Sequence, residues 1–423
     1  GGVRVLVTVD HGITALEAVA LARQRGMDVI ICDHHLPPPS LPPATAILNP
    51  RQADCPYPFK DLCGVGIAFK LLQGLFGPEA EDELWPSLDL VALGTIADLV
   101  PLLGENRILV KHGLVQLAGT ARPGLRALAE VAGIPLSRQG GIAAGRVAFG
   151  LAPRINAAGR LDDAAAAVRL LLTHDPSEAR ELATTLDRQN RERQELEGSI
   201  LAEALAQAVA EHDLTRDRAI VLASPAWHPG VIGIVASRLV ERFGRPTALI
   251  GTRGQEARGS ARSAGGWHIA DALGRCADLL LQYGGRFLSL AAEELTEEDL
   301  LPTLAADAEV HLDALDLALA DSLARLGPYG VGNPEPLLVA RRLQVMRTPR
   351  QVGQNHLKMK VRESSRGGQV MEAIGFNLGS FTQVLSQASA PQVDLAFVPE
   401  RNVWNDREIL QLRVKDLHIL PGP

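Results

Sequence analysis

Cysteine and long apolar runs are scarce in this chain of 423 residues. The four cysteines form no CxxC pair and have no regular spacing, which argues against a disulfide framework or a zinc ribbon and favours a reduced, cytoplasmic protein. No apolar run approaches the ~18 residues that a membrane span needs, so we expect no membrane contact. With 46% apolar and 22% charged residues, the composition is that of an ordinary globular protein.

Basic residues are fewer than acidic residues in the chain as a whole, but they are unevenly distributed along it. There are 42 basic and 49 acidic residues, a formal net charge of −7, which argues against a protein that coats nucleic acid by bulk charge. Locally, residues 213–290 hold ten Arg and six acidic residues, and residues 337–370 hold eight basic residues and one Glu. Residues 291–325 hold ten acidic residues and one Arg. Basic regions on an acidic protein are compatible with binding a single strand.

The length predicts several domains. Up to about residue 172, short β-branched runs alternate with helical stretches, which is typical of parallel strands joined by crossover helices. Because residues 3–9 already have the pattern of a strand and residue 1 is not Met, we expect the sequence to begin inside a domain. The expected divisions are a parallel-sheet α/β domain at 1–173, a long connecting helix at 174–212, a second, smaller α/β domain at 213–300, an acidic linker at 301–325 and a small β-barrel at 326–423.

Local patterns predict the individual elements. Residues 3–9 and 28–32 should form the first two strands. Thr14 and Glu17 have the spacing of a capping box that would begin the intervening helix. The tail strands are expected at residues 337–346, 356–363, 370–376, 393–399 and 408–414.

Polar residues that could bind a metal follow the first two predicted strands. Asp10 follows the first, and Asp33, His34 and His35 follow the second. The carboxyl ends of parallel strands lie at one edge of a sheet, so these residues should meet there. Asp98 ends the apolar run in LGTIADLVPL, where an uncompensated carboxylate would be costly. Carboxylates with imidazole and no thiolate suit Mn²⁺ or Mg²⁺ better than structural zinc.

Each of these residues also has a simpler interpretation. Asp10 could form a turn or a cap, and the Asp33 to His35 stretch could be an ordinary loop before the prolines that follow it. Asp98 alone favours neither interpretation. The three features together favour a metal site.

Seven ordered motifs carry a resemblance that extends over nearly the whole chain. The sequence resembles the DHH phosphoesterases, and within them the RecJ single-strand-specific exonucleases. The motifs are TVDHGI at 8–13, DHH at 33–35, LGTIADLVPL at 93–102, PRINAAGR at 153–160, WHPGVIGIVASRL at 227–239, GSARS at 259–263 and GPYGVGNPEP at 327–336.

The resemblance implies roles for the residues of the first motifs. Asp10, His34 and Asp98 would be ligands of a two-metal Mn²⁺ or Mg²⁺ site, Asp33 would orient a histidine, and His35 would donate to the scissile phosphate. The motif that supplies the remaining ligands should precede TVDHGI and is absent from this sequence. The metal site is therefore incomplete as the sequence stands.

The resemblance also implies contacts to the substrate. The residues expected to bind its phosphates are Arg154, Asn156, Arg160, His228, Gly259, Ser260, Arg262 and Ser263. Without the resemblance, PRINAAGR would be taken as a loop and GSARS as a surface turn. At Gly284-Gly285-Arg286 the family has Gly-Gly-His, so Arg286 receives no role.

The second domain and the tail are expected to resemble a DHHA1 domain and an oligonucleotide-binding (OB) fold. In the tail, Phe376 is expected to lie in the barrel core, while Trp404 is equally compatible with the core and with stacking on a base.

The implied function is a 5′ to 3′ exonuclease that degrades single-stranded DNA to mononucleotides in repair and recombination. Its partners would be single-stranded DNA, a single-strand-binding protein and a helicase. Two alternatives remain open: a DHH phosphodiesterase acting on short oligoribonucleotides or cyclic dinucleotides, and a replication scaffold that does not cut. The tail barrel argues against the first alternative, and the intact DHH motif argues against the second.

Overall fold

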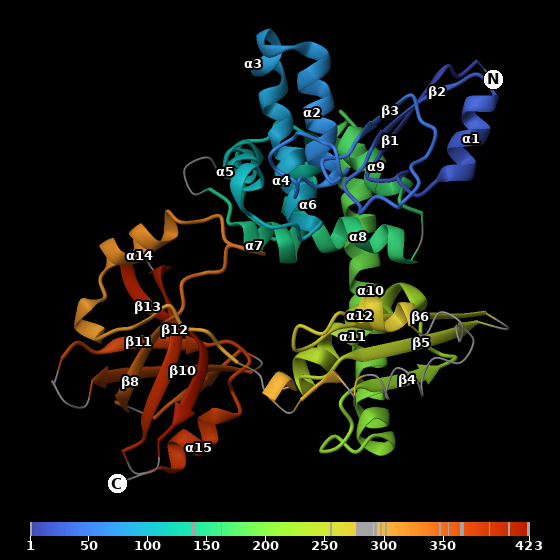
Figure 1. Cartoon of the computed structure of the whole chain (residues 1–423). Helices are drawn as coiled ribbons and strands as arrows, with labels where there is room; N and C mark the ends of the chain where they lie inside the picture. The colour runs from blue at the N-terminus through green and yellow to red at the C-terminus, as the bar shows by residue number, and fades with distance from the viewer. Residues whose placement is uncertain are drawn as a thin grey trace. The chain divides into compact units, whose positions relative to one another are not determined.

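The computed structural model of the chain is shown in Figure 1. The chain forms two compact units. Unit 1 comprises Gly1–Gly119, Ser137–Val147 and Leu304–Pro423, and unit 2 comprises Thr120–Leu136 and Ala148–Thr303. The structure describes residues 2–137, 141–161, 163–253, 256–275, 291, 294–296, 298–300, 303–346, 348–353, 355–363, 368–388, 390–404 and 407–420.

The first part of unit 1 contains a three-stranded parallel sheet in the order β1-β2-β3. The central strand, β2 (Asp28–Cys32), is the most deeply buried, with Val29, Ile31 and Cys32 fully inaccessible. Helices cover the sheet because their apolar faces have no other partner. The other elements are β1 (Val5–Val9), β3 (Ala46–Leu48), α1 (Leu16–Gln24), α2 (Gly64–Phe76), α3 (Glu81–Leu84), α4 (Leu88–Ala97), α5 (Gly104–Ala118) and α7 (Ala144–Arg146), with short 3₁₀ turns at Pro78–Ala80 and Trp85–Ser87.

The expected capping box is wrong. Helix α1 has Ala15 as its N-cap residue and no capping side chain. The chain makes a tight turn at Gly12, whose carbonyl accepts a hydrogen bond from the Ala15 N–H at 3.0 Å, and this leaves Thr14 in the turn before the helix. The spacing of Thr14 and Glu17 resembles a capping box, but the helix begins too late to use it.

The second part of unit 1 is a seven-stranded sheet in the order β7-β8-β12-β13-β11-β10-β9, with a further pairing of β8 and β10. Its core includes Leu343, Leu357 and Phe397, all fully buried. All five predicted tail strands are present, as β8 (Leu338–Val345), β10 (His356–Glu363), β11 (Met371–Gly375), β12 (Gln392–Trp404) and β13 (Arg407–Ile419). The smaller elements are β7 (Ala308–Glu309), β9 (Arg350–Val352), α14 (Leu317–Ala324), α15 (Phe381–Gln387) and a 3₁₀ turn at Leu312–Ala314.

The segment expected to be an acidic linker, residues 301–325, differs from that expectation. Its strand β7 pairs with β8 of the tail sheet, and Leu312 and Leu315 are buried in the core of that sheet. The acidic composition suggested a linker, but the acidic side chains lie mainly on the solvent side of the segment. A few leucines pack in the core of the tail sheet and hold the segment there.

Unit 2 is built along the 36-residue helix α10 (Pro176–Glu211), which confirms the long helix predicted from the sequence. The Asp175 carboxylate caps it by accepting a hydrogen bond from the Ser177 N–H at 2.8 Å. In Figure 1 the long green helix α10 extends from the helices α6, α8 and α9 to the α/β layer that contains α11. The bounds of its helical neighbours are α6 (Pro123–Val131), α8 (Ala152–Leu161) and α9 (Ala165–Leu172).

The α/β layer of unit 2 has a three-stranded sheet in the order β4-β5-β6. Strand β5 pairs in parallel with β4 and antiparallel with β6. The layer consists of β4 (Ile220–Ser224), α11 (Pro229–Phe243), β5 (Thr247–Arg253), β6 (Glu256–Arg262) and α12 (Ile269–Gly274), followed by a 3₁₀ turn at Glu298–Leu300. Within the described ranges, no helix has both the length and the apolar character needed to cross a membrane.

Candidate metal centre and phosphate contacts

The three predicted metal ligands, Asp10, His34 and Asp98, converge in unit 1. The Nε2 atom of His34 lies 3.0 Å from an Asp10 oxygen and 3.5 Å from an Asp98 oxygen. Asp10 follows β1 directly and has a φ of 62°, which bends the chain sharply at the end of the strand. His34 follows β2, and Asp98 is the C-cap residue of α4. The sheet edge and the end of one helix therefore bring together two carboxylates and one imidazole.

The Asp33 carboxylate holds the neighbouring His35. It is 1% exposed, and one of its oxygens lies 2.7 Å from His35 Nδ1 and accepts the His34 backbone N–H at 2.8 Å. Its other oxygen accepts the Ile13 N–H at 2.9 Å. Burial alone would raise the pKa of Asp33, but these hydrogen bonds outweigh it and lower the pKa. The hydrogen bond to Asp33 in turn raises the pKa of His35.

The electrostatics around Asp98 favour an added cation. Burial raises the pKa of Asp98, and the nearby negative charge of Asp10 raises it further, while His34 opposes the shift.

Candidate ligand atoms of Asp10, His34 and His35 all lie within 4.8 Å of one another. A cluster of oxygen and imidazole donors with no thiolate fits Mn²⁺ or Mg²⁺.

Gly64, the first residue of α2, lies directly against Asp10, a contact that the sequence did not predict. A Cβ atom at Gly64 would lie 2.4 Å from Asp10 Oδ1 and 2.5 Å from Asp10 Cβ. Any side chain at this position would therefore displace Asp10. No local pattern in the sequence indicates this, because the two residues are more than fifty positions apart.

The loop after Asp98 is supported by the GPYGVGNPEP segment. The Leu102 N–H donates to the Val331 carbonyl at 2.8 Å. A Cβ atom at Gly330 would lie 2.7 Å from Leu102 Cδ1. The motif thus has a structural role beside a candidate metal ligand, which the resemblance did not specify.

The remaining candidates belong to unit 2, where Arg154 is already engaged within the protein. Its guanidinium lies 2.8 Å from the Asp187 carboxylate through both Nε and Nη2, and it donates to the Gly150 carbonyl at 2.6 Å. This pair fixes α8 against α10. The predicted phosphate contact of Arg154 stays a prediction, and the ion pair adds a structural role that the sequence did not indicate.

Of the three arginines predicted to contact phosphate, Arg160 and Arg262 have no carboxylate within ion-pairing distance in the described part of the chain. Arg160 on α8 donates to the Gly230 carbonyl at 3.1 Å. Arg262 on β6 donates to Ser260 Oγ at 3.1 Å and to Ser237 Oγ at 3.2 Å. Burial and the neighbouring charges of Arg193 and Arg262 lower the pKa of Arg160. The concentration of positive charge suits a phosphate.

The first four residues of GSARS lie on strand β6, and Ser263 follows its end, so the simpler interpretation as a surface turn is wrong. Gly233 on α11 makes room for it, because a Cβ there would lie 2.8 Å from both Arg262 Nη2 and Ser260 Oγ. Gly259 has only ordinary contacts, the nearest at 3.6 Å, so protein packing alone does not require a glycine there. The Ser263 hydroxyl donates to the Trp267 carbonyl.

PRINAAGR likewise forms helix α8 instead of a loop. Asn156 lies on this helix, in the wall of a pocket that also contains Arg160. His228 is the N-cap residue of α11, and its Nδ1 accepts the Gly230 N–H at 3.1 Å.

The structure tests the prediction for Phe376 in the tail but not the one for Trp404. Phe376 is 50% exposed and packs edge-on against the His356 ring, with the ring centroids 5.0 Å apart, so the expected place in the core is wrong. It follows the end of β11, where the alternation of buried residues has ceased. The Trp404 side chain lies outside the described residues, as does the Gly284-Gly285-Arg286 stretch.

Comparison with known proteins identifies three family matches along the chain. Residues 4–95 match the N-terminal domain of the DHH family, residues 216–309 match the DHHA1 domain, and residues 306–416 match the RecJ OB domain. These matches confirm the predicted fold class, with the tail strands forming the sheet described above.

Relatives and solved structures agree with these matches. The chain is 39% identical over 440 residues to the single-stranded-DNA-specific exonuclease RecJ of Bacillus subtilis (strain 168), which covers 98% of the chain and 54% of that relative. It is 38% identical over 457 residues to the protein of the same name from Escherichia coli (strain K12), with coverages of 98% and 77%.

Among solved structures, the crystal structure of RecJ from Thermus thermophilus in complex with Mn²⁺ superposes with a TM-score of 0.78 at 33% identity, covering 99% of this chain and 62% of that chain. A structure of RecJ from the same organism in complex with Mg²⁺ superposes with a TM-score of 0.74 at 31% identity, covering 100% and 68%. The chain spans about half the length of the Bacillus relative. The identity over nearly all of this chain confirms the resemblance seen in the motifs, and the chain belongs to the RecJ family.

Proposed function

We propose that this chain carries the catalytic core of a metal-dependent exonuclease that degrades single-stranded DNA from the 5′ end to mononucleotides in repair and recombination. The observation that carries the proposal is the position of His34 between the carboxylates of Asp10 and Asp98. The names of the relatives support the choice of single-stranded DNA as substrate. The RecJ OB domain favours it over the small-substrate alternative.

In this proposal Asp10, His34 and Asp98 hold Mn²⁺ or Mg²⁺. When bound, the metal would activate water and neutralise phosphoryl oxygens during in-line displacement. Asp33 fixes the ring of His35 through Nδ1, which leaves the exposed Nε2 side to donate to a phosphate oxygen. Because its pKa is raised, His35 keeps a donor proton on Nε2 to a higher pH than an ordinary histidine.

We assign strand binding to residues of unit 2, with Arg160, Ser260 and Arg262 as the principal phosphate donors. The other residues expected to contact the strand are Arg154, Asn156, His228, Gly259 and Ser263. We place the protein in the cytoplasm, with a single-strand-binding protein and a helicase as partners. The described cysteines, Cys32, Cys55 and Cys63, are free thiols, which is compatible with a reducing compartment.

Digestion of a single strand labelled at either end tests the proposed function. Mn²⁺ or Mg²⁺ should support release of labelled mononucleotide from the 5′ end, and a chelator should stop it. Release from the 3′ end first would contradict the direction. Cleavage of short oligoribonucleotides or cyclic dinucleotides alone would favour the small-substrate alternative, and binding without cleavage would favour the scaffold.

Salt dependence tests whether phosphates dominate strand binding. Measured with chelator present, the logarithm of the association constant should fall linearly with the logarithm of the salt concentration, with a slope of ~0.7 per phosphate neutralised. Fluorescence anisotropy of a labelled single strand provides the measurement. A flat dependence would indicate binding by stacking or at a small-ligand site instead.

Gly64→Ala tests the placement of Asp10. The added methyl should displace the carboxylate and weaken Mn²⁺ binding by roughly ten- to a hundredfold, the range seen when residues that orient metal ligands are changed. Isothermal titration with Mn²⁺ measures the effect. Gly74→Ala is the matched control, since it lies on the same helix with nothing within 4 Å of its Cβ position. Equal affinities of the two variants would contradict the assignment.

A further inference from the structure

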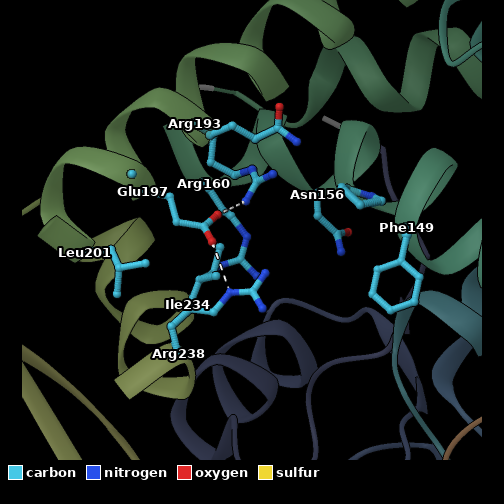
Figure 2. Close-up of a pocket in the computed structure, with 11 residues that line it drawn as sticks. Phe149, Asn156, Arg160, Arg193, Glu197, Leu201, Ile234 and Arg238 are labelled. Atoms are coloured by element: carbon cyan, nitrogen blue, oxygen red, sulfur yellow. Dashed lines mark hydrogen bonds and ion pairs between the residues drawn. The ribbon is translucent and has the colours of Figure 1, made fainter. Parts of the chain in front are cut away.

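Unit 2 contains a pocket of about 400 Å³ beside Arg160. Its walls come from α8, α10, α11 and the π-helical turn Val147–Leu151. Figure 2 shows Phe149 on one side of the pocket, Glu197 and Arg238 on the opposite side, and Asn156 between them. An aromatic ring thus faces a group of charged side chains across a space whose volume lies in the range of ordinary small-ligand pockets.

The Phe149 side chain is held in solvent by its buried neighbours. It is 86% exposed, whereas Leu151 and Ala152, which follow it, are 0% and 3% exposed. Gly150 packs so closely on Ile134 that a Cβ atom would lie 2.4 Å from the Ile134 side chain. The anchored turn therefore presents the ring outward at little further cost in conformational entropy, and π-helical turns of this kind are frequent at functional sites.

The opposite wall carries more positive than negative charge. Arg193 is 8% exposed and donates to Glu197 at 2.7 Å, while Arg238 Nε lies 3.6 Å from the other Glu197 oxygen. Arg160 adds a third guanidinium, which has no carboxylate within ion-pairing distance in the described ranges. Among the residues that line the pocket, one carboxylate therefore faces three guanidinium groups. Arg238 also pairs with Glu241, outside the lining, at 3.2 Å.

We propose that this pocket binds one nucleotide of a single DNA strand, with the base stacked on Phe149 and the phosphate held by Arg160 and Arg238. Asn156 lies where its amide can hydrogen-bond the nucleotide. Glu197 shares the arginines that the phosphate needs, so it competes with the phosphate and limits the affinity. The inference rests on the proposed function for the identity of the strand, and it adds Phe149, Glu197 and Arg238 to the residues predicted to contact it.

The stacking contact is tested with Phe149→Ala. Stacking on an aromatic side chain is lost, so a fluorescent 5′-phosphorylated oligo(dT) strand should bind about five- to a hundredfold more weakly in anisotropy measurements with chelator present. Phe149→Tyr should restore binding to within about twofold of wild type, since it keeps an aromatic face. Phe76→Ala, which removes a 57% exposed ring at the end of α2, is the matched control and should bind as wild type does.

The competition is tested with Glu197→Gln, which should bind the same strand about three- to tenfold more tightly at low salt, with a steeper salt dependence. Glu192→Gln is the matched control, because Glu192 lies exposed on the same helix and pairs with Arg188. Arg238→Gln should weaken binding. Thermal unfolding of each variant separates these effects from a loss of folding.

The outcomes distinguish the inference from the proposed function. Failure of the wild-type chain to bind any strand would overturn both. The pocket assignment alone would be overturned, and the proposed function would stand, if wild type binds the strand normally and either of two results is found. The first is equal binding by Phe149→Ala, and the second is weaker binding by a folded Glu197→Gln.

Discussion

Replacing His34 by Ala should reduce hydrolysis of single-stranded DNA by at least about a thousandfold while leaving strand binding nearly unchanged. His34 is the group that both Asp10 and Asp98 approach, so its loss removes the centre of the proposed metal site. A bound metal contributes several kcal/mol to phosphoryl chemistry, and each ~1.4 kcal/mol changes the rate tenfold. In the proposed function, strand binding depends on arginines of unit 2, so it should survive.

Rates come from release of labelled mononucleotide, and binding from anisotropy with chelator present. Asp98→Asn should show the same separation, since it keeps the shape of the side chain and removes its charge. His112→Ala removes an exposed histidine of α5 and should leave both measurements unchanged. Near wild-type cleavage by His34→Ala would refute the metal assignment.

Arg262→Ala should slow digestion of 5′-phosphorylated strands by roughly ten- to a hundredfold and affect 5′-hydroxyl strands much less. Arg262 is oriented by hydrogen bonds to Ser260 and Ser237, and no carboxylate of the described chain competes for it. A terminal phosphate carries extra charge, and charge-assisted hydrogen bonds contribute ~1.5 to 3 kcal/mol. The loss should therefore appear in kcat/KM for the phosphorylated end.

Comparing 5′-phosphorylated with 5′-hydroxyl strands shows whether Arg262 binds the terminal phosphate in particular. Equal losses on both would make Arg262 a general backbone contact, and no loss on either would remove it from substrate binding. Arg242→Ala is the control, because Arg242 is an exposed arginine in the last turn of α11. It should change neither rate by more than about twofold.

The part of the candidate metal cluster that lies at the sheet edge was predictable because strand order determines it. Asp10 and His34 follow neighbouring parallel strands, and such strands end at the same edge of a sheet. The long helix α10 and the five tail strands were predictable for a similar reason, since their hydrophobic periods are regular over many residues. These features follow from local sequence and simple topology.

Features that depend on distant partners were not predictable. The ion pair of Arg154 joins residues that are 33 positions apart, and the contact of Gly64 with Asp10 joins different elements. GSARS has the small and polar residues of a turn, yet antiparallel pairing with β5 makes it a strand. In each case tertiary packing outweighed the local pattern.

Diffraction from Mn²⁺-soaked crystals, recorded at the manganese absorption edge, would locate the metal that Asp10, His34 and Asp98 are proposed to bind. An anomalous peak should lie within bonding distance of His34 Nε2 and of carboxylate oxygens from Asp10 and Asp98, and it should disappear in His34→Ala crystals. A peak elsewhere with these three side chains still paired to one another, or an unchanged peak in the variant, would contradict the metal assignment.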